Sequence, residues 1–434
     1  MKISKLHIDQ FRHLENLEFD FTYPEDFHIE EKRGKPLDKI CFIGQSATGK
    51  TGLLELIYEY STELLNLELI NGNSLFPFRD FIRIKNNKIT FTIKNDILQF
   101  KNQEVIFKNR SYKNNNSDGG RVTSLIPQQD KNDSYYFKAN LISDKNIEIF
   151  SKNPVDLVEK YNSELQHIEK NFKNKDHYGV KFDDSINDEV WLFLLNEILN
   201  YRKNFTQKMS ELIHKGLLGN PIKLSSEFEN WQKENPNKLE SFAEKLNPIL
   251  GKLNLEVDLI NTEYSIPIKN KKNDEIIPIQ NTSTGTKGLL LSFLPLFKFD
   301  TKDSIILIDE PERSLFPDMQ MDLMDHYQNL APNAQFIIAT HSPFIAASFE
   351  PDERFILSFD KQGKVTVNRG SSPIGDDPND MLENDFGINY INKYGQKKHQ
   401  EYLDLKQKIY FEKDPKKKEE ISEQLEKLGE EYNF

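Results

Sequence analysis

Residues 44–51 read GQSATGKT and have the spacing of a loop that binds phosphate groups. Gly44 and Gly49 allow the backbone to curve closely around an anion, so that its N–H groups and the start of the next helix face the negative charge. Lys50 would reach the β- and γ-phosphates of a nucleotide, and the Thr51 hydroxyl would hold Mg²⁺. The residues that we expect to bind the nucleotide are Gly44, Gln45, Ser46, Ala47, Thr48, Gly49, Lys50, Thr51 and Gly52.

The segments on both sides of this loop favour a functional motif over a chance glycine-rich turn. The apolar run KICFIG precedes the loop and reads as a short buried strand. The run LLELIYEYSTELL follows it and reads as an apolar helix. A strand before the loop and a helix after it are the context that this motif requires.

Two carboxylates end another apolar run, IILIDE, later in the chain. A carboxylate at the C-terminal end of a strand lies beside the phosphate loop in a sheet of this class, so Asp309 is the expected partner of Mg²⁺. Glu310 is then the general base that orients and polarises the attacking water. Two acids after a strand often only begin a loop, but the complete phosphate-binding motif earlier in the chain favours the catalytic interpretation.

His341 follows the apolar run FIIAT, which reads as a further buried strand. A single histidine at a strand end is usually structural. Its place after the acidic pair in the chain favours a sensor of the γ-phosphate instead. We therefore predict two catalytic residues, Glu310 and His341.

The polar run NTSTGTKG, residues 281–288, leads directly into a block of leucines. We expect a helix over 287–297, with Ser283, the Gly285 backbone and the helix N-terminus forming a second phosphate-facing surface. Such a surface would complete the site of a nucleotide bound to another subunit. The alternative is an ordinary helix cap at Ser283 or Thr284, and the two interpretations are geometrically compatible.

Composition limits the remaining possibilities. The 434-residue chain is 37% hydrophobic with 31 Phe, which is enough for a core, and its net charge of −12 argues against a surface that is basic throughout. One cysteine, Cys41, excludes an intrachain disulfide and indicates a buried, reduced strand residue. The N-terminus is too polar for a signal peptide and no run is apolar enough to span a bilayer, so we expect a cytoplasmic protein without a membrane partner.

Taken in order, these motifs resemble the ABC-type ATPase heads of the RecF, SMC and OLD group over most of residues 1–360. The resemblance implies an α/β P-loop NTPase fold with a mixed sheet, a β-rich N-terminal lobe, a helical insertion and C-terminal helices. It implies ATP and Mg²⁺ as cofactors and a homodimer, or a higher oligomer, that closes around ATP. It also implies four segments: lobe I with the phosphate loop (1–150), the helical insertion (151–256), lobe II with the remaining motifs (257–370) and a charged helical extension (371–434).

The resemblance assigns further site residues. KLHIDQFRHL is similar to the family's first strand and turn, which makes Arg12 a nucleotide-site residue, and SLFP matches the D-loop with Ser314 and Leu315. The D-loop usually has His where this chain has Phe316, so that histidine's role is not carried over. The signature that acts on the partner's nucleotide would be Ser283, Thr284, Gly285, Thr286 and Lys287, and the Q-loop candidates are Gln128, Gln129 and Asn140.

The segments DEPERSLFPD and THSPFIAASFEP look most like the stand-alone ATPases of bacterial anti-phage systems, such as the Septu and PARIS ATPases. This narrower resemblance implies an ATP-dependent regulator of a separate nuclease or toxic effector. The alternative is a RecF-like repair ATPase that clamps nucleic acid, and a transporter ATPase is a distant third. Little sequence follows the head for a Toprim nuclease, and no CxxC hook is present. The acidic run at 375–380 is expected to be a solvated loop rather than a metal site.

Overall fold

A seven-stranded sheet lies at the centre of the fold. The computed structural model describes residues 1–66, 68–69, 87–101, 104–113, 120–121, 133–161, 179–389 and 391–432. The strand order is β11-β10-β15-β16-β3-β17-β18, and all neighbours are parallel except the antiparallel pair β17 and β18. The strands are β3 (Lys39–Gly44), β10 (Ser134–Phe137), β11 (Gly179–Phe182), β15 (Ile305–Asp309), β16 (Gln335–Ala339), β17 (Arg354–Phe359) and β18 (Val365–Arg369).

A second, antiparallel sheet of six strands has the order β2-β1-β5-β6-β7-β8. It forms the β-rich N-terminal lobe that the resemblance implies, and residues 70–86 lie outside the described part of the chain. A small three-stranded sheet has the order β12 (Leu255–Val257), β13 (Ile268–Asn270) and β14 (Ile276–Ile277). A further two-stranded sheet pairs β4 (Glu68–Leu69) with β9 (Gly120–Arg121). The six strands are β1 (Lys2–Phe11), β2 (Leu14–Asp20), β5 (Lys88–Ile93), β6 (Asp96–Lys101), β7 (Glu104–Phe107) and β8 (Arg110–Lys113).

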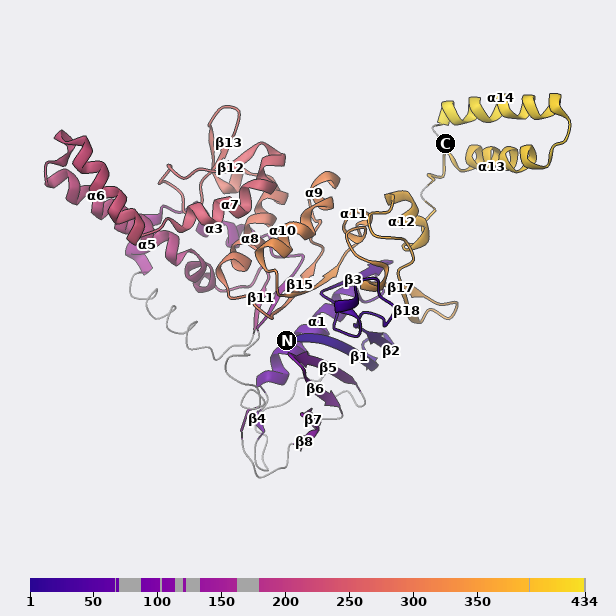
Figure 1. The fold of residues 1–434 in the computed structure, drawn as a ribbon, viewed down its shortest axis with the longest axis horizontal. Helices are drawn as coiled ribbons and strands as arrows, with labels where there is room; N and C mark the ends of the chain where they lie inside the picture. Colours follow the sequence, from indigo (N-terminus) through magenta and orange to yellow (C-terminus); the bar gives the residue numbers. More distant parts are fainter. Residues whose placement is uncertain are drawn as a thin grey trace.

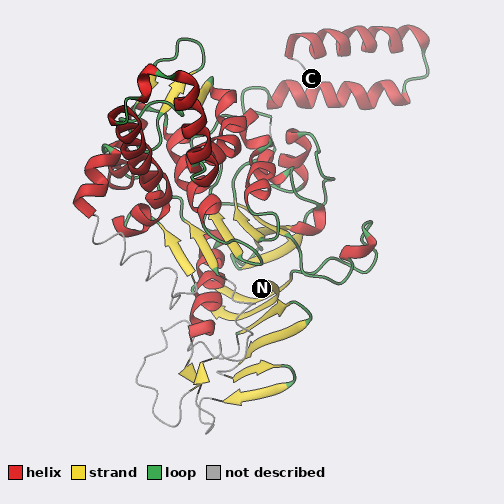
Figure 2. Cartoon of the chain, turned by 60° about the vertical axis from the view of Figure 1, so that its left-hand side comes forward, coloured by secondary structure: helices red, strands yellow, loops and turns green. Residues whose placement is uncertain are grey.

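Both faces of the central sheet are covered at its inner strands, which explains why β3, β15 and β16 are buried almost throughout rather than at alternate positions. In β3, Cys41 and Ile43 enter one hydrophobic core, while Ile40 and Phe42 enter the other. Helices cover the first face, and α1 with the antiparallel sheet covers the second (Figures 1 and 2). Cys41 is fully buried and free, as expected.

The helices surround this framework. The α-helices are α1 (Lys50–Asn66), α3 (Asp144–Ser151), α5 (Asp188–His214), α6 (Pro221–Glu234), α7 (Lys238–Leu250), α8 (Thr284–Lys298), α9 (Pro317–Met321), α10 (Leu323–Leu330), α11 (Pro343–Ala346), α12 (Pro378–Asn384), α13 (Gln396–Phe411) and α14 (Pro415–Tyr432). Short 3-10 turns are η1 (Glu30–Lys32), η3 (Leu217–Gly219), η4 (Gly251–Leu253), η5 (Ile279–Asn281) and η6 (Pro351–Glu353). In the described part of the chain, no helix combines the length and apolar character needed to cross a membrane.

The fold is therefore α/β with a mixed sheet, as the sequence predicts, and the four-segment division stays a proposal. The structure adds one fact about the proposed helical insertion. Its strand β11 pairs with β10 in the central sheet, and buried residues of α5 and α7, such as Trp191 and Phe242, belong to the same core as β15. The segment therefore packs as part of the main body and is not a separable appendage.

The C-terminal helices α13 and α14 pack side by side as an antiparallel hairpin, with the turn just before Pro415. Figures 1 and 2 both show this hairpin standing apart from the rest of the chain. Leu428 is its only buried residue among those described in the two helices, while Tyr410 and Phe411 are exposed. The hairpin therefore has no core of its own comparable to that of the main body.

A fully buried ion pair attaches the start of the C-terminal extension to the central sheet. Arg354 Nε of β17 lies 3.0 Å from Asp385 Oδ2, and both side chains are 0% exposed. Arg354 also donates to the Ser372 carbonyl, and Asp385 accepts N–H groups from Ser371 and Ser372. Burial lowers the pKa of Arg354 and the Asp385 carboxylate opposes that effect, so each charge depends on its partner.

Asp385→Ala is expected to lower the free energy of unfolding by about 3–5 kcal/mol, because it leaves the Arg354 charge buried without its counter-ion. Urea unfolding followed by circular dichroism measures this change. Glu383→Ala, at an exposed position of α12, removes one negative charge as a control and should change stability little. Equal stability of the two variants would show that the buried pair does not hold this segment in place.

Candidate active site

The strand order brings three distant segments to one edge of the central sheet. Strands β15, β16 and β3 are neighbours and parallel, with Asp309 paired to Ala339 and Ala339 paired to Phe42. Their C-terminal ends therefore lie together, and this edge is where ligands bind in parallel sheets. It carries the phosphate loop after β3, the acidic pair after β15 and His341 after β16.

The phosphate loop has the backbone shape that its glycines were expected to allow. Gly44 has a φ of +135°, and a Cβ built there would lie 2.0 Å from the Leu357 carbonyl oxygen of β17. Gly49 has a φ of +96°, and Ala47 also adopts a left-handed φ of 65°. Only glycine allows β3 to approach β17 this closely while the chain turns into α1.

Lys50 closes this loop from the first turn of α1. Its Nζ donates to the carbonyls of Gly44 and Gln45, both at 2.9 Å. Burial lowers the pKa of Lys50 to about 8, although the carboxylates of Asp309, Glu310 and Glu312 oppose that effect. An ammonium held by two carbonyls in a partly buried loop is ready to exchange them for stronger acceptors, and phosphate oxygens are such acceptors.

Thr51 and Asp309 meet across the sheet edge as the sequence predicts. Thr51 Oγ1 donates to Asp309 Oδ1 at 3.2 Å. Burial raises the pKa of Asp309 to about 6, the Thr51 hydrogen bond lowers it, and the charges of Glu310 and Glu312 raise it further. A buried carboxylate surrounded by other carboxylates gains most from a nearby cation. A hydroxyl beside such a carboxylate is a donor set that suits Mg²⁺.

Glu310 occupies a strained backbone position directly after β15. Its φ is 52°, in the left-handed region, and its N–H donates to the Ala339 carbonyl of β16 at 2.9 Å. Strain of this kind persists only where surrounding contacts impose it, and it is concentrated at functional sites. The hydrogen bond to β16 fixes the position of the Glu310 backbone, from which its side chain extends.

His341 lies at the same edge, and a residue that the sequence reading did not assign holds its backbone. The Glu312 carboxylate accepts the His341 N–H at 2.8 Å. Burial raises the pKa of Glu312, and the His341 N–H opposes that effect. Burial and the charge of Lys50 lower the pKa of His341, which favours a neutral imidazole. Glu312 belongs to the acidic run DEPE, so its type was visible in the sequence but its partner was not.

Arg12 lies beside the phosphate loop, at the tight turn between β1 and β2. Its Nη2 is 2.8 Å from Glu55 Oε2, and Lys138 Nζ reaches the other Glu55 oxygen at 3.1 Å. Burial alone would raise the pKa of Glu55, but the hydrogen bonds from Lys138 and Arg12 outweigh it and lower the pKa. Arg12 Nη1 also lies 3.4 Å from the position of a Cβ on Gly52. Its role in nucleotide binding remains a proposal.

In the polar run 281–288, the helix begins earlier than the sequence predicts. Helix α8 begins at Thr284 and not at residue 287, because the Ser283 side chain accepts the Thr286 N–H at 3.2 Å and starts the helix earlier. The capping interpretation is therefore confirmed. Ser283 and Thr284 are exposed, whereas Gly285 and Thr286 are buried and Lys287 is half-buried.

Gly285 packs against Ser314 and Leu315 of the same chain. A Cβ on Gly285 would lie 2.5 Å from the Ser314 carbonyl oxygen and 2.9 Å from Leu315 Cδ2. Ser314 has a left-handed φ of 62°, Leu315 is buried, and Phe316 is 72% exposed. The part of α8 that remains available to a partner is therefore Ser283, Thr284 and the side chain of Lys287.

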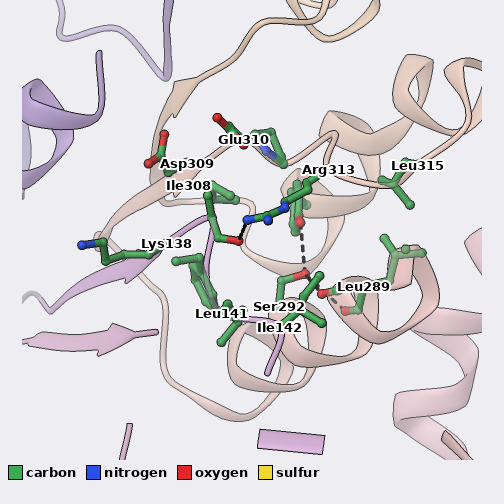
Figure 3. A pocket seen from close by; sticks show the side chains of 16 residues that line it. Lys138, Leu141, Ile142, Leu289, Ser292, Ile308, Asp309, Glu310, Arg313 and Leu315 are labelled. Atoms are coloured by element: carbon green, nitrogen blue, oxygen red, sulfur yellow. Dashed lines mark hydrogen bonds between the residues drawn. The ribbon is translucent and has the colours of Figure 1, made fainter. Parts of the chain in front are cut away.

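A small cavity of about 50 Å³ separates the end of β15 from α8. Figure 3 shows Asp309 and Glu310 on one side of this cavity and Ile142, Leu289 and Ser292 on the other. Arg313 reaches across it and donates to the Ala139 carbonyl. This contact joins the segment after Glu310 to the turn that follows β10.

Of the three Q-loop candidates, the structure describes only Asn140. Gln128 and Gln129 lie outside the residues that the structure describes. Asn140 is exposed in the turn after β10, next to the Ala139 carbonyl that Arg313 contacts. Since β10 is the parallel neighbour of β15, this turn lies at the same sheet edge as Asp309. Asn140 remains a proposed sensor on the basis of this position.

The residues present fit ATP and Mg²⁺. The glycines let the loop turn from β3 into α1 with Gly44 against the backbone of β17, and Thr51 with Asp309 offers the hydroxyl and carboxylate that a hard cation uses. The described residues contain no group of three or more His, Cys, Asp or Glu side chains able to hold a metal ion. In the acidic run at 375–380, Asp377 caps α12 by accepting the Asn379 N–H at 2.8 Å.

Comparisons with known proteins agree with this geometry. A family described as AAA ATPase domain matches residues 1–346, which include every described site residue named above. The chain is 22% identical over 385 residues to the "Retron Vc95 probable ATPase" of Vibrio cholerae serotype O1 biovar El Tor, covering 78% of this chain and 73% of that protein.

Solved structures of Smc heads are also similar. One is the Pyrococcus furiosus Smc head domain with an extended coiled coil bound to the C-terminal domain of ScpA, with a TM-score of 0.39, 15% identity, and coverage of 85% of this chain and 96% of that chain. Another is the SMC head domain from Thermotoga maritima, with a TM-score of 0.41, 11% identity, and coverage of 86% and 100% respectively.

Proposed function

Because the chain belongs to the AAA ATPase domain family, we propose that it binds ATP with Mg²⁺ and hydrolyses it to ADP and phosphate at the edge formed by β3, β15 and β16. The observation that carries this proposal is the contact between Thr51 Oγ1 and Asp309 Oδ1, 3.2 Å apart although 258 positions separate the two residues in the sequence. When bound, Mg²⁺ neutralises charge on the β- and γ-phosphates. Lys50 and the loop N–H groups hold those phosphates from the other side.

In this proposal each remaining residue has one task. Glu310 would accept a proton from the attacking water, since it directly follows β15 at the edge that carries the phosphate loop. His341 contacts the γ-phosphate from the end of β16, and Glu312 positions it through its backbone N–H. Asn140, in the turn after β10, acts as the sensor, and Arg12, in the turn between β1 and β2, contacts the nucleotide.

We further propose that two copies close around ATP, so that Ser283, Thr284 and Lys287 of one copy face the nucleotide of the other. The exposed positions of Ser283 and Thr284 at the N-terminus of α8 support this role, because a helix N-terminus attracts negative charge. Phe316, exposed on the neighbouring D-loop, supplies an apolar contact for the same face.

The biological role that we propose is regulation of a separate nuclease or toxic effector in anti-phage defence. The motif resemblance to stand-alone defence ATPases supports it, and the relative named as a retron ATPase agrees with it. The exposed hairpin α13–α14 is a suitable attachment for such a partner. A RecF-like clamp on nucleic acid is the second candidate, since the fold class is shared.

Specific ATPase activity is expected to rise with protein concentration and to level off once dimers dominate. A constant specific activity, in a protein that stays monomeric with ATP, would contradict the shared site.

Duplex DNA binding by the isolated protein, with an affinity that falls as salt rises, would instead favour the clamp. Activation of a co-expressed nuclease would favour the regulator.

A further inference from the structure

A single carboxylate in helix α1 holds two cations that come from separate parts of the fold. Glu55 Oε2 accepts a hydrogen bond from Arg12 Nη2 at 2.8 Å, and Glu55 Oε1 accepts one from Lys138 Nζ at 3.1 Å. Arg12 belongs to the turn between β1 and β2 of the antiparallel sheet, whereas Lys138 directly follows β10 of the central sheet. Glu55 therefore connects both sheets to the helix that begins at the phosphate loop.

Glu55 also lies close to the residues that would hold Mg²⁺. It follows Thr51 by one helical turn, so the two side chains share a face of α1. Strands β10 and β15 are parallel neighbours, and their register places Lys138 beside Asp309 where both strands end. Figure 3 shows the Lys138 side chain pointing away from the small cavity, on the side of the sheet edge where Asp309 lies. The two ion pairs of Glu55 are thus adjacent to the contact between Thr51 and Asp309.

The Arg12 guanidinium is fixed on several sides although its side chain is 58% exposed. It lies 4.9 Å from the centre of the Phe11 ring, and its Nη1 is 3.4 Å from the position of a Cβ on Gly52. Arg12 has a left-handed φ of 56°, a conformation that persists only where surrounding contacts maintain it. Together with the bond to Glu55, these contacts keep the cation beside the first turn of α1.

Lys138 is the first residue of the turn that carries Asn140, and this turn is fixed from two directions. The Lys138 side chain attaches it to α1 through Glu55. The carbonyl of the next residue, Ala139, accepts a hydrogen bond from Arg313, which follows the acidic pair after β15. The position of the turn therefore depends on both the phosphate-loop helix and the segment of the general base.

We propose that Glu55 is a positioning residue for ATP hydrolysis, which holds Arg12 beside the phosphate loop for nucleotide binding and holds Lys138 beside Asp309 for turnover. This inference rests on the proposed ATPase function. Glu55 acts through its two cations, and neither oxygen of its carboxylate needs to contact the nucleotide. Arg12 serves binding, while Lys138 keeps the turn with Asn140 in register with the phosphate loop.

Glu55→Gln keeps the size of the side chain and removes the charge that strengthens both hydrogen bonds. The KM for ATP should rise and kcat should fall, each by about tenfold, because misplacing a positioning group by about 1 Å can cost about 10²-fold in rate. Glu15→Gln is the matched control, since Glu15 is 41% exposed, lies three positions after Arg12 and pairs with Lys364 at 3.1 Å. It should change either constant by less than about twofold.

Arg12→Gln and Lys138→Gln separate the two roles of Glu55. The first should raise mainly KM, and the second should lower mainly kcat. Because Glu55 acts through these two residues, adding Glu55→Gln to the double variant should change both constants by less than about twofold. Lys138→Arg keeps the cation and should restore most of kcat. A purely structural role of Glu55 would produce neither this split nor this loss of additivity.

Several results would overturn the inference. These are wild-type KM and kcat for Glu55→Gln, full additivity in the triple variant, or a lower unfolding temperature of Glu55→Gln with unchanged kinetics of the folded protein. Failure of the ATPase proposal itself looks different, because the wild-type protein would then release no phosphate. Binding of a fluorescent ATP analogue still tests Glu55 in that case: Glu55→Gln should bind it about tenfold more weakly, and equal binding, or no binding by the wild type, would refute the inference.

Discussion

Glu310→Gln should leave ATP binding intact and lower the rate of hydrolysis by about 10²–10⁴-fold, because an amide cannot accept a proton from water. The residue follows β15 at the edge that holds the phosphate loop, and its backbone is fixed to β16 through the Ala339 carbonyl. The substitution keeps the size and shape of the side chain. Binding of a fluorescent ATP analogue and release of phosphate measure the two effects separately.

Glu312→Gln is the matched control for this experiment. Glu312 is a carboxylate of the same segment, but its Oε1 already accepts the His341 N–H. Glutamine keeps an oxygen acceptor for that contact, so the loss of activity should be much smaller than for Glu310→Gln. If Glu312→Gln abolished turnover while Glu310→Gln hydrolysed ATP at the wild-type rate, the general base would be Glu312.

Ser283→Asp is expected to abolish ATP hydrolysis while ATP still binds to the phosphate loop of the same chain. Aspartate caps a helix as well as serine does, so α8 should still begin at Thr284. Its carboxylate would, however, oppose the γ-phosphate of the partner's nucleotide. Ser283→Asn is the control, because asparagine also caps the helix and brings no charge. It should retain much more activity than Ser283→Asp.

Mixing Ser283→Asp with Lys50→Ala tests the shared site directly. Lys50→Ala removes the ammonium that binds the phosphates, so this variant alone should be inactive. Each mixed dimer contains one site with an intact phosphate loop from the Ser283 variant and an intact α8 from the Lys50 variant. Random mixing in equal amounts should return about a quarter of the wild-type activity if the two sites of a symmetric dimer act independently.

Two results would contradict this arrangement. Wild-type hydrolysis by Ser283→Asp alone would show that residue 283 is only a helix cap. Absence of activity in the mixture, with mixed dimers verified by mass photometry of differently sized tags, would show that the two sites do not combine in this way or must act together.

Much of the site could be predicted from the sequence because its parts are local. The phosphate loop is formed by eight consecutive residues, and the glycines, Lys50 and Thr51 determine its shape and chemistry without help from distant segments. Asp309 and Glu310 were recognisable because they end a buried apolar strand. The capping role of Ser283 also follows from its type and its place before a leucine-rich helix.

Only the tertiary structure decided which of these parts meet, since strand order depends on long-range pairing that no local pattern contains. It placed β16 between β15 and β3, and so brought Thr51 to Asp309. It gave Glu312 its hydrogen bond from the His341 backbone and placed Gly285 against Ser314 and Leu315. It also gave Glu55 two cationic partners, which the sequence shows only as one acidic residue in a helix. Whether a charged side chain finds a partner is a property of the packed chain, because burial and contact arise together.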